Sequence, residues 1–513
     1  MTEPDVTVIV PVYNTMPYLT ECLDSLVAQS IGEQRMRIIA VDDGSTDGSG
    51  AELDRYAQRH PGLVTVIHQA NSGGPAAPCN RGLDAATGRY VFFVGADDYL
   101  GPEALDRLVT AADAYGSDVV LGKVVGVHSR HIYQDVFARN EVDLDLFDSP
   151  LPRSLANTKL FRRAPLEEHH IRYLEDMRIG SDLPFTLEAC YRAKRISVVA
   201  DYPCYYAVRR FSATNITYLS KHALRVWTVE RVMAFVAGLI PAGKQRDAIL
   251  LRRFDHEVAR LLEDDLLGLD RETQQLVHDR IGRVVTDHLT GDIADRLGAE
   301  PRIRMALTRD GELDDLLAAI RQDASAGVPA TVAVQGRDYA AYPGYGRLSA
   351  TAFDVTGSPD WPVKLDATAV AWARGTLTVT ARSPRPALGP LSVSAEDVPA
   401  DVTVAGNTAT IRFRAADLLA SSDPSGQRRV VSAQPGDFDP AVALGAANAT
   451  GAAGAAAVRA PGLRVSAPVI RRRGARLYVI TPVVDTSGRL MISVVPISAQ
   501  RVITQLRRLL RRS

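Results

Sequence analysis

The stretch VTVIVPVYN, residues 6–14, decides the fold. It is an unbroken apolar run that ends in Tyr13 and Asn14, which is typical of a strand buried on both faces. A segment with leucines at helical spacing follows at 17–30. Strand-like and helical patterns then alternate, and this alternation predicts a parallel sheet covered by helices, an α/β domain. The further apolar runs lie at 37–43, 63–69 and 89–95.

Polar residues follow the predicted strands, and the ligand crevice of such a sheet lies beyond its carboxyl ends. Asp43 stands in VDDGSTDGSG and can accept a hydrogen bond from a nucleobase N–H, while Ser45 and Thr46 are expected to cap the next helix. Asp97 and Asp98 in FVGADDYL can offer hard oxygen ligands to a divalent cation. The alternatives are a capped turn and a solvated loop, neither with a ligand.

Composition bounds the function classes. The chain has 513 residues, 46% hydrophobic and 23% charged, with a formal net charge of -1. This predicts a globular protein of several domains and gives no reason to expect a nucleic-acid partner. The four cysteines are scattered, as in a reduced cytosolic protein. We find no secretory signal and no membrane-spanning run, so we predict a cytoplasmic protein with at most peripheral membrane contact.

The pattern changes along the chain and predicts five parts. Beyond the α/β domain, apolar residues recur at helical spacing, and later runs alternate over short distances between Gly, Pro and Asp, as in β-sandwich modules. We expect these modules to serve oligomer assembly, as a homo-oligomer, or acceptor binding. The predicted parts are an α/β domain 1–216, a helical linker 217–328, a β-sandwich module 329–425, a second β-rich module 426–498 and a basic amphipathic helix 499–513.

The helix at 499–513 suits binding to an anionic membrane surface on the inner face of the cell membrane, because apolar and arginine residues lie on opposite faces. Packing against its own domain or a partner chain is the alternative.

The motifs VIVPVYN, VDDGSTDGSG and FFVGADDYL, in this order and spacing, resemble those of family-2 glycosyltransferases with the GT-A (Rossmann-like) fold, over about residues 5–215. The block NSGGPAAPCNRG is most similar to that of wall teichoic acid poly(ribitol-phosphate) N-acetylglucosaminyltransferases. Those enzymes share the plan of a helical segment followed by immunoglobulin-like β modules.

The resemblance implies a UDP-sugar site. Pro11, Tyr13 and Asp43 would surround the nucleobase, with Asp43 on uracil N3–H. Asp97 and Asp98 would share the ribose and the metal, Mn²⁺ or Mg²⁺. The remaining donor-binding residues would be Asn71, Asn80, Arg209, Arg210 and Ser212.

The catalytic base is expected in SDLPF, where the family carries an acidic pair before a helix. The second acid of that pair deprotonates the acceptor, which makes Asp182 the candidate base. Asp182 could instead, or also, cap the helix, and Glu175 and Asp176 compete for the role of base.

Three positions depart from the family pattern: Gly95 and Ser181 replace acids, and Cys79 replaces an arginine. The leading hypothesis is an inverting, metal-dependent transfer of a sugar, GlcNAc from UDP-GlcNAc, to a hydroxyl of an anionic cell-envelope polymer such as teichoic acid or polysaccharide. The alternative is a catalytically weak paralogue that binds glycan or acts as a scaffold. The sequence leaves open the sugar, the acceptor, the linkage and the oligomer number.

Overall fold

The computed structural model describes most of the chain. Arg210, Ser212 and the predicted helix 499–513 lie outside the described residues. The chain divides into two compact units, one of residues 1–261 and 271–296 and the other of 262–270 and 297–513. The described residues are 3–128, 130–209, 222–329, 331–356, 358, 365–383, 391–395, 398–420, 427–435, 456–457, 469–473, 476–484 and 490–496.

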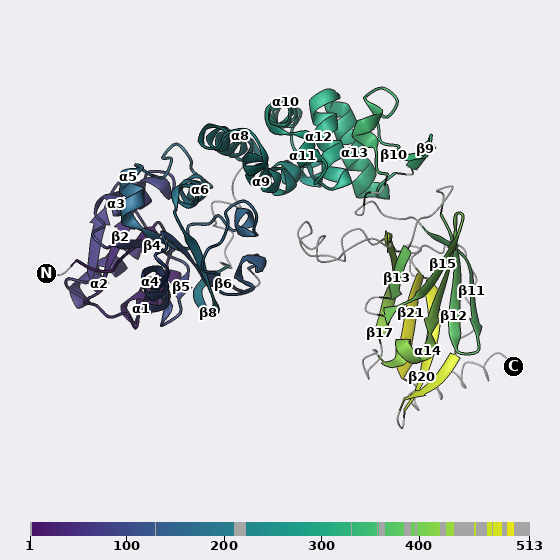
Figure 1. Ribbon diagram of the computed structural model, residues 1–513, viewed down its shortest axis with the longest axis horizontal. Coiled ribbons are helices and arrows are strands. Elements are labelled where there is room, and N and C mark those ends of the chain that lie inside the picture. Colours follow the sequence, from purple (N-terminus) through teal and green to yellow (C-terminus); the bar gives the residue numbers. More distant parts are fainter. Residues whose placement is uncertain are drawn as a thin grey trace. The chain divides into compact units, whose positions relative to one another are not determined.

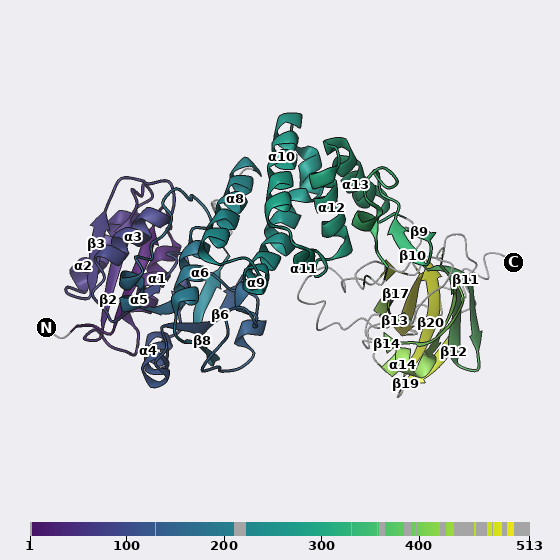
Figure 2. The same cartoon turned by 45° about the horizontal axis from the view of Figure 1, so that its top comes forward.

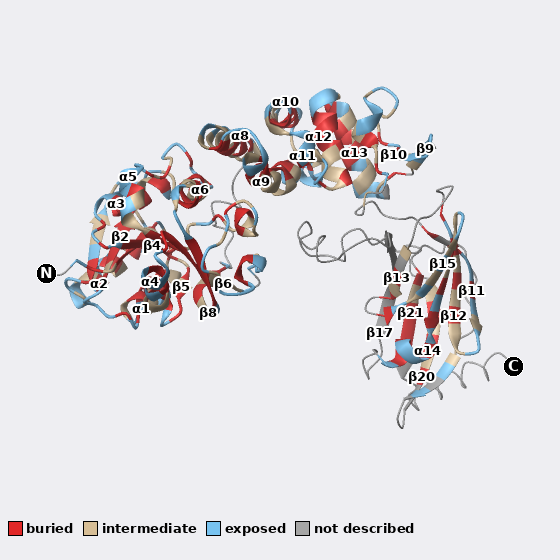
Figure 3. Cartoon of the chain, viewed as in Figure 1, coloured by how far each residue is buried: buried red, intermediate tan, exposed pale blue. Residues whose placement is uncertain are grey.

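The first unit is built on an eight-stranded sheet with the order β3-β2-β1-β4-β7-β6-β8-β5. The first four strands run parallel, as the sequence predicts. Their residues are largely buried, and the strands of this sheet are red in Figure 3. The strands are β1 (Val6–Val12), β2 (Met36–Asp42), β3 (Val64–His68), β4 (Tyr90–Phe93), β5 (Tyr99–Leu100), β6 (Val119–Val127), β7 (Lys159–Arg162) and β8 (Ile196–Val208).

The second half of the sheet departs from the parallel pattern of the first four strands. β7 pairs antiparallel with both β4 and β6, and β5 pairs antiparallel with β8. β7 lies between β4 and β6 in the sheet although it is distant from β4 in the sequence. Its short apolar run does not indicate whether it pairs parallel or antiparallel with its neighbours. The sheet is therefore mixed, and only its first half has the doubly wound pattern.

Helices cover both faces of this sheet (Figures 1 and 2). On one face lie α1 (Tyr18–Val27), α2 (Ser49–Arg59) and α4 (Ala104–Tyr115). On the other lie α3 (Ala76–Asp84), α5 (Arg163–Glu168) and α6 (Asp182–Arg192). Two short 3₁₀ turns, η1 (Asp135–Phe137) and η2 (Leu151–Arg153), follow β6.

Four aromatic residues form the core between the sheet and α6. Phe93 makes edge contacts with Phe161 and Phe185, at centroid distances of 6.2 and 5.4 Å. Tyr173 stacks on Phe185 at 4.3 Å with an interplanar angle of 10°. All four are at most 3% exposed, so they fix α6 against the end of β4.

The predicted helical segment is confirmed. Within the described residues, no helix is long and apolar enough to cross a membrane. The first unit contains α8 (His222–Leu239), α9 (Lys244–Arg252), η3 (Arg253–Val258), α10 (Arg271–His288) and α11 (Gly291–Ala294), and the second contains η5 (Asp264–Gly268), α12 (Ala299–Asp310) and α13 (Leu313–Ala326), with η4 (Ala259–Leu262) at the division.

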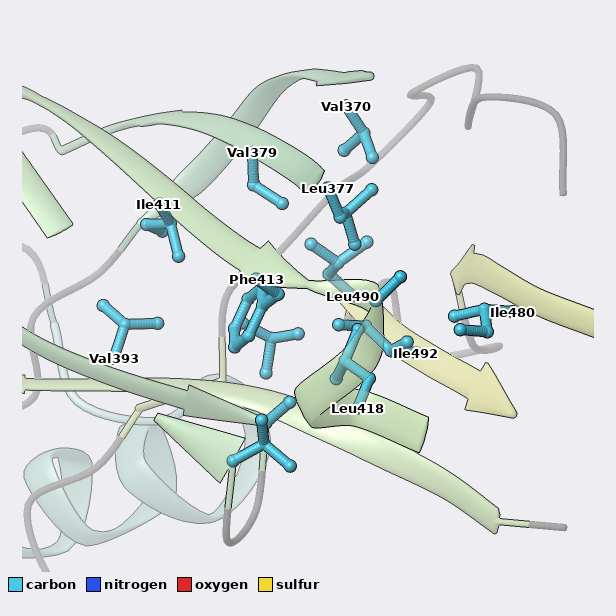
Figure 4. Packing of buried hydrophobic residues seen from close by; sticks show 14 of the residues in the cluster. Val370, Leu377, Val379, Val393, Ile411, Phe413, Leu418, Ile480, Leu490 and Ile492 are labelled. Carbon is cyan, nitrogen blue, oxygen red and sulfur yellow. The ribbon is translucent and has the colours of Figure 1, made fainter. Parts of the chain in front are cut away.

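The second unit also holds two larger sheets. One has the order β11-β12-β16-β15 and the other β14-β13-β17-β21-β20-β19, with β18 paired to β17. Residues of both sheets and of α14 (Ala415–Ala420) join one hydrophobic cluster (Figure 4). Strand bounds are β11 Asp366–Ala373, β12 Thr376–Arg382, β13 Leu391–Ala395, β14 Val398–Pro399, β15 Asp401–Ala405, β16 Thr408–Arg414, β17 Gln427–Pro435, β18 Ala456–Ala457, β19 Val469–Arg473, β20 Arg476–Val484 and β21 Leu490–Pro496; a separate hairpin joins β9 (Thr331–Val334) to β10 (Arg337–Ala340), and η6 is Ala350–Phe353.

This arrangement differs from the predicted boundary at residue 425. β13 pairs with β17 across that boundary, and Val393 shares its hydrophobic cluster with Ile492. The alternation of apolar residues indicates where strands lie but not which strands pair. The sequence therefore predicts two modules where the structure has one hydrophobic cluster. Whether the sheets are immunoglobulin-like stays a prediction.

The aromatic core predicts a large cost for truncating Phe161. We expect Phe161→Ala to destabilise the first unit by about 3–5 kcal/mol, because the cavity is enclosed by rigid rings. Thermal unfolding of the full chain should show its transition lowered by about 10 °C. Phe147→Ala is the matched control: Phe147 is only half-buried and touches Tyr191 at its edge. Equal shifts in the two variants would contradict the assignment.

Candidate functional site

The carboxyl ends of β1 and β2 meet at one edge. Val12 lies in register with Asp42, and the Asp43 N–H donates to the Val12 carbonyl at 2.8 Å. Pro11 is partly exposed, and the Tyr13 side chain is 49% exposed. An aromatic ring left open beside buried carboxylates can stack on a planar ligand.

Asn14 joins the turns after β1 and β2. It has a φ of 49°, which places its backbone in the left-handed region. Its N–H donates to Ser45 Oγ at 3.1 Å, and its Oδ1 accepts from the Thr46 N–H at 2.8 Å. The prediction that Ser45 and Thr46 cap α2 is wrong, because the cap position is Gly48 and has no side chain. Both residues bind Asn14 instead.

Asp43 organises the loop after β3. Its carboxylate is 2% exposed and accepts hydrogen bonds from Gln69 Nε2 at 2.7 Å and Ser72 Oγ at 2.9 Å. The Ser72 N–H and, more weakly, Asn71 Nδ2 add to these. Gly44 makes the approach possible, since a Cβ there would lie 2.8 Å from the Asn71 nitrogen.

Asp97 and Asp98 have different surroundings. Asp97 is partly exposed, whereas Asp98 is 6% exposed and bound to β8. Asp98 Oδ2 accepts from the Tyr205 hydroxyl at 2.6 Å, and Oδ1 accepts from the Val208 N–H at 2.7 Å. Arg130 approaches Oδ1 at 3.4 Å. Burial, and then the negative charge of Asp97, raise the pKa of Asp98 to about 6.

A side chain at Gly95 would have to displace the carboxylates of the acidic turn. A Cβ at this position would lie 2.9 Å from Asp98 Oδ2 and 3.3 Å from Asp97 Oδ1. The two carboxylates therefore converge above the Gly95 backbone, whose N–H donates to the Tyr205 hydroxyl at 3.0 Å.

The residues fit a divalent cation only if a bound ligand and water supply the rest of its coordination shell. Among the described residues, no group of three or more His, Cys, Asp or Glu side chains could hold a metal. Asp97 is the partly open carboxylate, and both oxygens of Asp98 already accept hydrogen bonds. Such a turn can supply one ligand to a cation whose other ligands come from a diphosphate and water.

Asp182 is the first residue of α6, and Ser181 occupies the cap position without a side-chain cap bond. Burial raises the pKa of Asp182, while its own backbone N–H and then the positive charge of Lys159 oppose that rise. Lys159 is 2% exposed, and burial lowers its pKa to about 8. Its Nζ donates to the carbonyls of Ser154 and Ala156. A carboxylate with a raised pKa is a stronger proton acceptor.

The two competitors for the role of base have other partners. Glu175 accepts from Asn80 Nδ2 at 2.9 Å, and Asp176 forms an ion pair with Arg231 at 2.8 Å. Both carboxylates are exposed. These contacts favour Asp182.

Aromatic packing brings the acidic turn and Asp182 toward each other. Phe93 lies two residues before Gly95, and Phe185 lies three residues after Asp182. Because these two rings touch, the end of β4 and the start of α6 are neighbours.

Asn80 does not have the environment predicted for a donor-binding residue. It is 9% exposed, and its amide binds the backbone of Tyr173 and the side chain of Glu175. Cys79 is 1% exposed. Burial, and then the charge of Asp182, raise the pKa of its thiol. Asn71 and Arg209 are exposed, and the Arg209 N–H donates to the Val127 carbonyl at 3.2 Å.

Sequence reasoning missed several residues that build the site. Tyr205 and Arg130 hold Asp98, and Gln69 and Ser72 hold Asp43. Ser72 stood inside the quoted NSGG block and offered a signal. Tyr205 lies 107 residues from its partner, so no local pattern connects them.

Comparison with known proteins gives two family matches. The family model "Glycosyl transferase family 2" matches residues 7–172. The model "Glycosyl transferase TarS linker domain" matches residues 224–320.

Three similar proteins add to this. A poly(ribitol-phosphate) beta-glucosyltransferase of Bacillus spizizenii is 40% identical over 205 residues, 40% of this chain and 32% of the relative. The uncharacterized glycosyltransferase EpsJ of Bacillus subtilis is 33% identical over 274 residues, 50% of this chain and 77% of the relative. The crystal structure of S. aureus TarS residues 1–349 with UDP-GlcNAc matches with a TM-score of 0.58 and 25% identity, over 66% of this chain and 97% of that one.

The match to the first of these relatives spans about a third of that relative's length. The structural match confirms the GT-A arrangement of the first unit, and the linker match agrees with the helices after β8.

Asp98 predicts a pH-dependent stability. Its folded pKa of about 6 lies above the ordinary 3.8, so its contribution to stability is fully present below about pH 4 and is lost as pH rises through 6. In chelator-treated protein, Asp98→Asn should remove a loss of stability of at most about 3 kcal/mol that accumulates between about pH 4 and pH 6. Thermal midpoints across this range measure it. Asp106→Asn, an exposed carboxylate, should leave the profile intact; an unchanged profile in Asp98→Asn would refute the assignment.

Proposed function

The chain belongs to glycosyl transferase family 2, and from that premise we propose that it transfers a sugar from a UDP-sugar to a hydroxyl of an anionic cell-envelope polymer. GlcNAc is the proposed sugar, supported by the similar TarS structure with UDP-GlcNAc. A teichoic-acid-type chain is the proposed acceptor, supported by the poly(ribitol-phosphate) relative, whose own name gives glucose as the sugar. The observation that carries the proposal is the contact of Phe93 with Phe185, which makes the acidic turn and the candidate base neighbours.

The donor occupies the edge formed by β1, β2 and β4. Its uracil stacks on the exposed Tyr13 ring, beside Pro11, and its N3–H reaches Asp43. Asn71 lies at the same loop, and its Nδ2 bonds the Asp43 carbonyl at 2.9 Å. The diphosphate lies toward Asp97 and Arg209. Arg210 and Ser212, outside the described residues, keep their predicted role at the diphosphate.

Asp182 acts as the general base in an inverting displacement. Its carboxylate takes the proton of the acceptor hydroxyl while the hydroxyl oxygen forms a bond to the anomeric carbon. The bond from that carbon to the diphosphate oxygen breaks on the opposite face, and the electron pair leaves with UDP. The raised pKa of Asp182 moves it toward the operating pH and so strengthens it as a base.

We place Mn²⁺ or Mg²⁺ on Asp97 and donor oxygens. Such a cation neutralises charge on the departing diphosphate. Asp98 holds the turn in shape through Tyr205 and Val208 rather than serving as the main ligand.

An arginine cluster in the first unit supports an anionic acceptor. Burial, and then four arginines, lower the pKa of His256 to about 3, so this ring is neutral. Burial lowers the pKa of Arg252 as well, with Arg253 and Arg153 adding to the effect. Asp255 forms an ion pair with Arg153 at 3.6 Å, and Glu257 forms one with Arg253 at 2.9 Å. A phosphate group near Arg252 would relieve the repulsion between the arginines. The four arginines are Arg153, Arg252, Arg253 and Arg260.

Ser181 is the residue that favours the alternative of a catalytically weak paralogue. Its hydroxyl is buried beside Asp182 without a hydrogen-bond partner among the described residues, so the usual orienting acid has no substitute there. Assembly as a homo-oligomer and membrane binding through 499–513 also stay predictions.

The base assignment predicts a specific loss. Asp182→Asn should lower kcat by about 10²–10⁴-fold while the Kd for UDP changes little, because the amide fills the same space without accepting the proton. UDP release from UDP-GlcNAc with poly(ribitol phosphate), with and without Mn²⁺, measures the first, and calorimetry measures the second. Asp176→Asn is the matched control and should retain most activity. Turnover that survives in Asp182→Asn, or UDP binding without turnover in the wild type, would refute the enzyme proposal.

The arginine cluster predicts a change confined to the polymer. Arg252→Ala should raise KM for poly(ribitol phosphate) about tenfold, equivalent to about 1.4 kcal/mol, with donor KM unchanged. Arg107→Ala is the control, because Arg107 is paired with Glu103 on the exposed side of α4. Steady-state rates with polymer titrated at two salt concentrations test this. A similar KM in both variants would show that the cluster does not bind the acceptor.

A further inference from the structure

Asn80 makes three hydrogen bonds to one short segment. Its Oδ1 accepts from the Tyr173 N–H at 2.9 Å, and its Nδ2 donates to the Tyr173 carbonyl at 3.0 Å and to Glu175 Oε1 at 2.9 Å. The amide thus pairs with the Tyr173 backbone as a neighbouring strand would. Asn80 and Tyr173 are 93 residues apart and both are buried.

Tyr173 is held on its side chain too. Asn157 Nδ2 donates to its hydroxyl at 2.8 Å. The ring stacks on Phe185 and meets the Phe93 edge at 5.2 Å. Phe185 lies in the first turn of α6, the helix that begins with Asp182. Asn80 on α3 is therefore connected to the first turn of α6 through one intermediate side chain.

The segment between Tyr173 and Asp182 also packs closely against the loop between β3 and α3. A Cβ on Gly74 would lie 3.0 Å from the Arg178 Cα and 3.1 Å from its carbonyl oxygen. Met177 is fully buried. The segment thus lies directly against the loop after β3, whose Ser72 binds Asp43, and its path fixes the start of α6 relative to that loop.

We propose that Asn80 is a positioning residue for the catalytic base and not a contact of the donor. Every hydrogen bond of its side chain is directed at residues 173–175, which lead to Asp182. α3 packs on β1 and β2, the strands that end at the donor edge, so the Asn80 amide sets the distance between donor and base. This inference rests on the proposed function, in which Asp182 accepts the proton of the acceptor hydroxyl.

The test compares Asn80→Ala and the milder Asn80→Ser with wild type in the full chain. Asn140→Ala is the matched control, because its Oδ1 also accepts two backbone N–H bonds, from Ala200 and Asp201, at a distant point of the same sheet. We expect Asn80→Ala to lower kcat at least tenfold while donor KM and the Kd for UDP stay within about twofold. Amide hydrogen exchange over residues 173–181 should accelerate in Asn80→Ala and not in Asn140→Ala.

The outcomes separate the explanations. If the Kd for UDP weakens tenfold with unchanged exchange at 173–181, Asn80 contacts the donor as the sequence predicts, and the inference is overturned. An equal loss of kcat in Asn140→Ala would reduce the effect to general destabilisation and also overturn it. If Asn80→Ala does not fold, Asn80→Ser decides between the same results. If the wild type binds UDP without turnover, the proposed function fails, while affinity and exchange still decide whether Asn80 holds the segment or touches the donor.

Discussion

The edge contact between Phe93 and Phe185 is the interaction on which the candidate site depends. Phe93 ends β4, from which the acidic turn projects, and Phe185 lies in the first turn of α6, from which Asp182 projects. Rigid rings packed at full density transmit position well, since they leave no void for either element to move into. A flexible aliphatic contact here would hold the same elements together with less control over their spacing. The chemistry proposed for this chain needs that control, because a displacement requires the base and the leaving group on opposite sides of one carbon.

Two buried carboxylates, Asp43 and Asp98, also fix the positions of chain segments around the site, through hydrogen bonds. Asp43 collects donors from the loop after β3, and Asp98 collects them from the end of β8. An unpaired buried carboxylate would be costly, so each one forces the surrounding chain to supply hydrogen bonds. Loops that are distant in sequence thereby acquire fixed positions. The cost remains visible in Asp98, whose pKa is raised to about 6 despite its partners.

The sequence predicted the first four strands and the residues at their ends because that information is local. Apolar runs of the right length define the strands, Asp43 directly follows β2, and Asp97 stands four residues after the end of β4. What it could not predict depends on pairing. The antiparallel direction of β7, the single cluster shared across residue 425 and the contact of Tyr205 with Asp98 all join residues far apart in the chain. Asn80 shows the limit most clearly: its motif was recognised, but the direction of its amide follows from where Tyr173 lies.

The three departures from the family pattern have different physical meanings. At Gly95 an added Cβ would lie 2.9 Å from Asp98 Oδ2 and 3.3 Å from Asp97 Oδ1, so a side chain there would require these carboxylates to shift. At Cys79 the thiol is 1% exposed, and Asp182 and Tyr173 both act on its pKa, so a charged side chain at this position would be buried beside these two residues. Of the three, only Ser181 leaves a polar atom without a hydrogen-bond partner among the described residues, a buried hydroxyl beside Asp182. The first two are therefore consistent with a site whose parts have adjusted to one another, and in the proposed reaction the orientation of Asp182 is the property that would limit activity.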